Sequence, residues 1–221
     1  MIGTLNEGPL HQALKALYAR PGSQEEVSID DFVADVVDGN QIIEIQTRGF
    51  GALKKKLPVF LSTHRVKLVH PIAQTRTIVK VQNDAETRRV SPKHGSPFDI
   101  FAELVYIPQI LNDPNFDIDV VLIEEDEYRE YDGRRGRRKR GWVTTGRHLV
   151  QVVEVVTVGS MEDLFGRVAT DLTVTFTSAD LGHVMKRPRS LGQKAAYCFR
   201  VAGLTRVCGK NGNELVYEKS K

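Results

Sequence analysis

Residues 31–46 place an acidic residue in the middle of each of two short apolar runs, and this pattern constrains the fold more than any other feature of the chain. The runs are separated by Asp-Gly-Asn at residues 38–40, a turn signal that typically joins the two strands of a β-hairpin. The acids are Asp35 in the first run and Glu44 in the second. The segment therefore predicts a hairpin in which each strand carries one carboxylate.

The relation between the two acids depends on the register of this hairpin. If residues 39 and 40 alone form the loop, Asp35 lies directly opposite Glu44, with Cβ atoms about 5 Å apart. If residues 38 and 39 form it, the acids are diagonal neighbours at about 7 to 8 Å; a regular loop of odd length puts them on opposite faces. Facing carboxylates repel each other unless a proton or a cation lies between them, and Mg²⁺ prefers such oxygen ligands. The alternative is a pair of exposed acids on a solvated sheet face.

A helix is predicted over residues 7–19, because apolar residues recur there at helical spacing. Glu7 falls in line with Leu10 and Leu14 on the inward stripe of this helix, and His11 follows one turn later. An acid on an inward stripe is a candidate ligand for the hairpin site. The alternative is a first-turn glutamate that the helix dipole favours.

The segment from residue 7 to about residue 85 predicts a small α/β unit. After the helix come a short strand at 26–29, the hairpin, a helix at 52–61 and two strands at 66–69 and 77–81, the first of which His70 and Pro71 close. The polar, basic stretch 83–95 is predicted to be a surface loop. The order of elements is therefore α-β-β-β-α-β-β.

The middle of the chain carries the strongest local concentration of positive charge. A helix is predicted from Ser96 to Pro108, a strand at 115–123 and another at 143–158, with an acidic stretch at 124–130 between them. A basic run follows the acidic stretch, and such a run is solvated or holds phosphates. Its members are Arg134, Arg135, Arg137, Arg138, Lys139 and Arg140.

The C-terminal segment has the order helix, helix, turn, helix and two-stranded hairpin, which is the plan of a winged helix-turn-helix module. The helices are predicted to begin near residues 160 and 177 and to span 191–202, and the hairpin covers 204–217. Such modules bind DNA with the last helix, although others mediate contacts between proteins. The candidate DNA-binding residues of this module are Arg187, Arg189, Gln193, Lys194, Tyr197, Arg200 and Lys210. Lys54 and the six residues of the basic run are further candidates for contact with DNA.

The N-terminal residues resemble the PD-(D/E)xK nuclease superfamily. The resemblance covers about residues 5–85 and rests on Asp35, on Glu44-Ile45-Gln46 and on Glu7 in the first helix, in that order of elements. Competence-linked nuclease-like members are similar in having Gln in the place of the usual Lys. The resemblance implies a mixed sheet flanked by helices, of the α/β (α+β) class, and hydrolysis of phosphodiester bonds.

This resemblance also implies a metal site. Asp35, Glu44 and the carbonyl of Ile45 would hold Mg²⁺ or Mn²⁺, Glu7 would complete the set of ligands, and Gln46 would be the fourth catalytic residue. An amide can hold a water molecule but supplies no positive charge. Neighbouring cations would then offset charge on the phosphate, and the candidates are Lys15, Arg48 and Lys54.

The remaining expectations concern organisation and compartment. Three domains are expected: a nuclease core at 1–90, a basic α/β extension at 91–158 and the winged helix at 159–221. Two cysteines form no disulfide framework, the N-terminus has no signal-peptide pattern and no apolar run approaches the length of a membrane span. A cytoplasmic protein without membrane contact is therefore expected.

The predicted function is that of a metal-dependent DNA nuclease in repair, recombination or defence, acting on duplex or branched DNA. A homodimer would supply the two active sites that symmetric cleavage needs. The alternatives are a non-catalytic DNA-binding protein, either a regulator or a nuclease partner with a degenerate core, and a protein that processes RNA.

Overall fold

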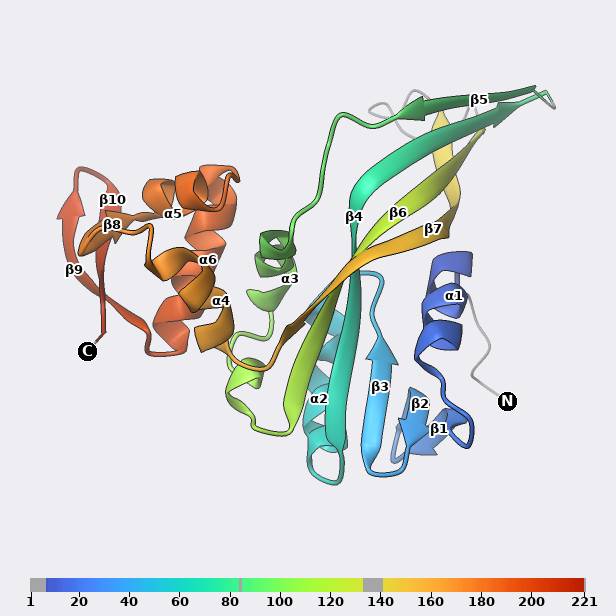
Figure 1. Cartoon of the computed structure of the whole chain (residues 1–221), viewed down its shortest axis with the longest axis horizontal. Helices are drawn as coiled ribbons and strands as arrows, with labels where there is room; N and C mark the ends of the chain where they lie inside the picture. Colours follow the sequence, from blue (N-terminus) through green and yellow to red (C-terminus); the bar gives the residue numbers. More distant parts are fainter. Residues whose placement is uncertain (1–6, 84, 133–140, 221) are drawn as a thin grey trace. The chain divides into compact units, whose positions relative to one another are not determined.

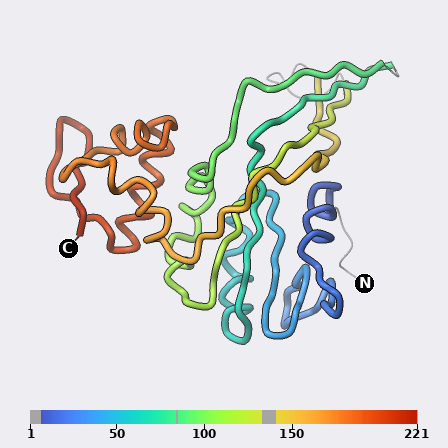
Figure 2. Tube along the Cα trace, in the orientation of Figure 1, coloured from blue at the N-terminus to red at the C-terminus, as the bar shows by residue number. Residues whose placement is uncertain are grey.

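The computed structural model describes residues 7–83, 85–132 and 141–220. It has a mixed α/β architecture of the α+β kind and divides into two compact units, each built from three separate stretches of the chain. The first unit contains residues 1–47, 69–97 and 120–156, and the second contains 48–68, 98–119 and 157–221. Figure 2 traces the chain as it passes between them. The units are interleaved in sequence because β4, β6 and β7 are long strands that contribute to both.

Among the described residues, seven strands form the larger sheet, in the order β1-β2-β3-β4-β6-β7, with β5 paired to β4. The strands are β1 (Gln24–Ile29), β2 (Phe32–Asp38), β3 (Gln41–Ile45), β4 (Arg65–Gln82), β5 (Ala85–Val90), β6 (Phe116–Tyr131) and β7 (Trp142–Val158). β1, β2 and β3 pair antiparallel, whereas β3 and β4 run in the same direction (Figure 1). Parallel neighbours need a crossover, and the chain makes it through a 3₁₀ turn (Phe50–Ala52) and α2 (Leu53–Leu61).

The core of the first unit lies between the sheet and helix α1 (Pro9–Tyr18). Leu10 and Leu14 of this helix are buried against one face of the central strands, where they meet Val36, Ile43, Ile45, Val69, Val121 and Ile123. Because side chains four apart share a helix face, this packing also places His11 and Lys15 beside the sheet. α1 therefore aligns the candidate site as well as closing the core.

The second unit contains the C-terminal elements and a cluster of aromatic residues. Helix α3 (Phe101–Leu104) follows a 3₁₀ turn (Pro97–Ile100), and a further 3₁₀ turn (Ile110–Asn112) precedes β6. Then come α4 (Met161–Ala169), β8 (Thr175–Thr177), α5 (Ser178–Val184), α6 (Arg189–Val201), β9 (Thr205–Asn211) and β10 (Glu214–Lys219). Phe199 of α6 meets Phe101 and Phe165 edge-to-face, with ring centroids 5.2 and 4.9 Å away. β10 pairs with both β8 and β9 in a three-stranded sheet.

Two glycines explain how closely α5 and α6 approach each other. A Cβ on Gly192 would lie 2.0 Å from the carbonyl oxygen of Ser178 and 2.8 Å from the backbone nitrogen of Gly182. No side chain fits at that distance. The helix pair is thus set by backbone contact.

Several predicted elements are confirmed, and others differ from the structure. The hairpin, the helix at 52–61, the strand at 143–158 and all C-terminal elements are present with small shifts at their ends. β4 is one strand of 18 residues, not two. Proline has no N–H to donate to a neighbouring strand. Pro71 is tolerated in β4 because it lies beyond the last described hydrogen bond between β4 and the end of β3, which runs from the Gln46 N–H to the Val69 carbonyl.

The segment 83–95, predicted to be a loop, contains strand β5. Its exposed residues show no alternation of apolar and polar side chains, so the sequence carries no strand signal, but their backbone pairs with β4. The predicted helix from Ser96 to Pro108 is shorter and mostly 3₁₀. The predicted strand at 115–123 continues through the acidic stretch to Tyr131. Among the described residues, no helix is both long and apolar enough to cross a membrane.

Candidate functional site

The hairpin has the first of the three registers considered from sequence. Asp38 pairs with Gln41 across the loop of Gly39 and Asn40, and Val36 pairs with Ile43. Asp35 and Glu44 are the next residues in this register. They are only 8% and 3% exposed. The alternative of two solvated acids is therefore wrong.

Asp35 lies at the point where the ladder between β2 and β3 gives way to a side-chain contact. Its Oδ2 accepts a hydrogen bond of 2.6 Å from the Ile45 N–H. In a regular antiparallel ladder, this N–H would donate to a backbone carbonyl of β2 instead. On the other side of Asp35, the β1 ladder skips Glu26, whose φ of 54° is rare for a residue with a side chain. The sheet is thus irregular on both sides of this carboxylate, which is a frequent property of functional sites.

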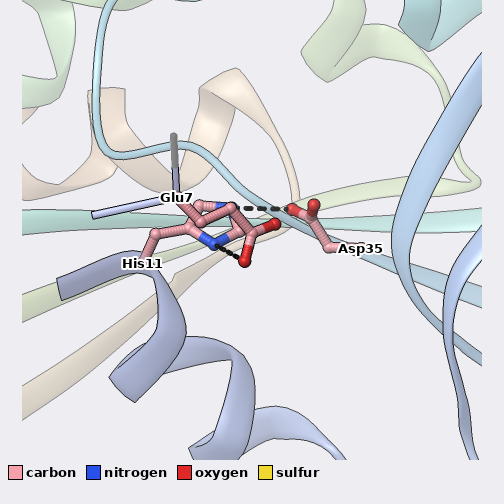
Figure 3. Close-up of side chains that lie close together, drawn as sticks. All are labelled: Glu7, His11 and Asp35. Carbon is pink, nitrogen blue, oxygen red and sulfur yellow. Dashed lines mark hydrogen bonds and ion pairs between the residues drawn. The ribbon is translucent and has the colours of Figure 1, made fainter. Parts of the chain in front are cut away.

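His11 connects Asp35 with Glu7 (Figure 3). Its Nε2 lies 3.2 Å from Asp35 Oδ2, and its Nδ1 lies 3.3 Å from Glu7 Oε2. Burial lowers the pKa of His11, but the hydrogen bond to Asp35 and the negative charges of Asp35 and Glu7 raise it by more, so the net shift is upward. A protonated His11 takes the place of a cation between two carboxylates.

Lys15 supplies a second positive charge one helical turn further along. Its Nζ lies 2.9 Å from Glu7 Oε2 and 2.5 Å from Glu26 Oε1. Burial lowers the pKa of Lys15, but hydrogen bonds to Glu26 and Glu7 raise it by more. Sequence reasoning missed Glu26, because an acid in an edge strand carries no signal until the fold places it beside the helix.

Glu7 reaches this cluster from outside the helix in which it was predicted. α1 begins at Pro9 with Gly8 as its N-cap, because the fixed φ of proline suits the first helical position. The expected helix start at residue 7 is therefore wrong by two residues. Glu7 nevertheless meets both His11 and Lys15.

Among the described residues, one group of potential metal ligands has its donor atoms within 4.8 Å of one another, and it consists of Glu7, His11 and Asp35. Glu44 is not in this group. Two carboxylates and an imidazole suit Mn²⁺ better than Mg²⁺, which prefers oxygen ligands. These three residues could hold a divalent ion if His11 is neutral, because imidazole binds metals without its proton.

The backbone that follows Glu44 is fixed at three points. The Gln46 N–H donates to the Val69 carbonyl, and the Gln46 carbonyl accepts a bond of 2.6 Å from His70 Nδ1. The Thr47 carbonyl accepts a bond of 2.8 Å from Arg147 Nη2. The strand end that carries Gln46 is therefore held rigidly.

The predicted DNA-binding residues are of three kinds in the structure. Lys54, Arg189, Gln193, Tyr197, Arg200 and Lys210 are exposed. Arg187 and Lys194 are engaged within the second unit, since Arg187 Nε lies 2.9 Å from Asp99 Oδ1 and Lys194 Nζ donates to the Ala102 carbonyl. Arg134, Arg135, Arg137, Arg138, Lys139 and Arg140 lie outside the described residues.

Residues 8–159 match the model of a family described as "Domain of unknown function (DUF8091)". The chain belongs to the DUF8091 family. The matched region of this DUF8091 protein contains α1, both acidic strands and the whole of the larger sheet, and it ends just before α4. A relative from Treponema pallidum (strain Nichols), described as an uncharacterized protein, is 36% identical over 142 residues, which cover 62% of this chain. The match spans 56% of that relative's length. No solved structure matched this DUF8091 protein.

Proposed function

We propose that this protein is a metal-dependent DNA nuclease whose metal site is formed by Glu7, His11 and Asp35. The observation that carries the proposal is the convergence of these three side chains, which come from the residue before the N-cap of α1, from α1 and from β2, with donor atoms within 4.8 Å of one another. Buried carboxylates are costly unless cations neutralise them. A binding site for a divalent ion is a reason to keep them there.

The order of elements supports the same proposal. A helix, an antiparallel hairpin with an acid in each strand, a crossover helix and a parallel strand follow one another from α1 to β4. This agrees with the arrangement that the resemblance to PD-(D/E)xK nucleases implies. Gln46 stands where those nucleases usually have Lys, on a backbone fixed by His70.

Each residue of the site would have a separate role in catalysis. Asp35 is held by the Ile45 N–H, so its carboxylate is oriented before any ligand binds. Lys15 holds the Glu7 carboxylate in place through their 2.9 Å contact. A bound divalent ion would lower the pKa of a coordinated water molecule and offset negative charge on the scissile phosphate. The Gln46 amide would orient that water by hydrogen bonds.

The C-terminal elements support a DNA-binding role. α4, β8, α5, α6 and the β9–β10 hairpin follow the order of a winged helix, with a three-stranded sheet. In such modules the last helix enters the major groove. Gln193, Tyr197 and Arg200 are exposed on α6 and would face the DNA.

A cleavage panel tests this function. The purified protein is incubated with linear, nicked, branched and single-stranded DNA and with RNA, in Mg²⁺, in Mn²⁺ and in EDTA. We expect cleavage of at least one DNA with a divalent ion, none in EDTA and none by Asp35→Asn or Glu7→Gln. The matched control is Asp30→Asn, an exposed acid in the turn before β2. If the wild-type protein cleaves none of these substrates, the proposed nuclease activity is refuted.

One observation favours a second candidate, a non-catalytic DNA-binding protein. Glu7 already has two protein cations beside it, His11 and Lys15. Glu7 is therefore paired with protein side chains of opposite charge without a metal. This candidate predicts DNA binding without cleavage and without any effect of Mn²⁺.

A further inference from the structure

The sheet face that α1 covers continues beyond the helix as a charged surface. Side chains two apart in a strand share a face. Along β6, Val121 and Ile123 lie in the core beneath α1, so Glu125, Glu127 and Arg129 point to the same side. This is also the side of the sheet on which His11 and Lys15 meet the acids.

Buried glutamates hold arginines on this surface. Glu125 lies 2.6 Å from Arg76 Nε and 3.7 Å from Arg147 Nη1. Glu127 lies 3.0 Å from Arg76 Nη1 and 2.6 Å from Arg129 Nη2. The side chains of the two acids are 0% and 7% exposed, whereas those of Arg76, Arg129 and Arg147 are 34%, 23% and 26% exposed.

The two glutamates are therefore buried beneath the arginines, whose guanidinium groups reach solvent. Burial raises the pKa of Glu127, but Arg129 and Arg76 lower it by more, so this carboxylate stays ionised. Each arginine is held in one orientation before it meets a ligand. Preorganised guanidinium groups bind phosphates well, because they lose little freedom on binding.

The positive charge extends along β4 and β5. Ile78 lies two residues from both Arg76 and Lys80 and pairs with Arg89, so these three cations share one face. Lys80 Nζ lies 4.3 Å from the centre of the Trp142 ring, and Trp142 meets Tyr131 edge-to-face. The surface formed by Arg76, Lys80, Arg89, Arg129 and Arg147 is named the arginine face. Among the described residues that these contacts place on the arginine face, there are five cations and two acids, Glu125 and Glu127.

A purely structural ion network would be close to balanced. An excess of fixed cations beside an exposed tyrosine is instead what a nucleic-acid strand requires, since phosphates pair with the cations and bases stack on aromatic rings. Arg147 also donates to the Thr47 carbonyl, directly after Gln46. One end of the arginine face thus adjoins the strand that carries the candidate catalytic residues.

We propose that the arginine face binds the phosphate backbone of DNA and leads one strand to the candidate metal site. Binding itself needs no metal and no cleavage. The choice of DNA and the statement that the bound strand is a substrate rest on the proposed function.

Adjacent arginines on β5 provide a matched test. Arg89 pairs with Ile78 on the arginine face, whereas Arg88 pairs with Val79 and contacts Asp126 on the opposite face. Neither arginine is bound to a buried glutamate, so both can be replaced by Gln with the same change of charge and little risk to folding. Fluorescence anisotropy of a labelled oligonucleotide in EDTA, over a range of salt concentrations, measures the affinity.

We expect Arg89→Gln to weaken binding and to reduce the slope of log affinity against log salt by about 0.7 for a single strand or about 0.9 for a duplex. Lys80→Gln combined with Arg89→Gln should reduce the slope by about twice as much, and Arg88→Gln should leave it unchanged. Arms with single-stranded DNA, duplex DNA and RNA show which backbone is bound best.

Equal effects of Arg88→Gln and Arg89→Gln would overturn the proposal. Tighter binding of RNA than of DNA, or equal competition by heparin and DNA, would overturn the choice of DNA. Because the assay contains no metal, a protein that binds through Arg89 but never cleaves contradicts only the proposed nuclease. A protein that cleaves while Arg89→Gln binds normally contradicts only the arginine face.

Discussion

Replacing Asp35 tests whether its carboxylate orients β3 as well as binding a metal. In the structure it accepts a 2.6 Å hydrogen bond from the buried Ile45 N–H. A hydrogen bond to a charged acceptor contributes about 1.5 to 3 kcal/mol, and a buried donor left without an acceptor costs about 1 to 3 kcal/mol. Asp35→Ala removes the acceptor, so local opening at Ile45 should become easier by about 3 kcal/mol. Asp35→Asn keeps an acceptor oxygen and should cost about 1 kcal/mol.

The assay is amide hydrogen exchange measured by NMR in EDTA. At 1.4 kcal/mol for each factor of ten, exchange of the Ile45 amide should accelerate about a hundredfold in Asp35→Ala and about fivefold in Asp35→Asn. The amide of Phe199 in the second unit serves as an internal control and should not change. Exchange at Ile45 that is the same in Asp35→Ala as in wild type would refute the role of Asp35 as a backbone acceptor.

Three further predictions concern other parts of the chain. The raised pKa of His11 means that its stabilising contact is fully present below about pH 6.5 and is lost as pH rises through the pKa of His11 in the folded state. The difference in unfolding free energy between wild type and His11→Gln should therefore shrink from pH 6 to pH 9. A difference that stays constant over this range would contradict the prediction. Burial raises the pKa of the Cys198 thiol to about 12, while Cys208 is exposed, so a thiol reagent at pH 8 should modify one cysteine rapidly in the folded protein and two in urea. Gly192→Ala should destabilise the second unit by about 2 kcal/mol or more in thermal unfolding, whereas Gly166→Ala, with open space around it, should not.

The sequence predicts the hairpin and most helices because their signals are local. The turn at residues 38–40 and the helix caps Ser160 and Thr177 depend only on near neighbours, and each is present in the structure. The length of β4 and the existence of β5 are not predictable in this way. They depend on pairing between strands, which allows Pro71 inside a strand and allows polar residues to form one.

The candidate site was predictable in part for the same reason. Asp35, Glu44 and Glu7 stand out as acids among apolar residues, and a register of the hairpin could be enumerated from the turn. Glu26 and Arg147 could not be found, because each reaches the site region through contacts between distant segments. Nor could sequence alone indicate that His11, not Glu44, completes the group of potential ligands.

Titration with Mn²⁺ shows whether Glu7, His11 and Asp35 form a metal site. The free ion is followed by electron paramagnetic resonance as it is titrated into wild type, Asp35→Asn and Glu7→Gln at pH 8, where His11 is more often neutral than at pH 6. The metal site predicts one bound ion per chain in the wild type, weaker binding at pH 6 because protons compete for His11, and loss of that ion in both variants. Wild-type protein that binds no Mn²⁺, or variants that bind it as tightly as wild type, would rule out a metal site formed by these residues.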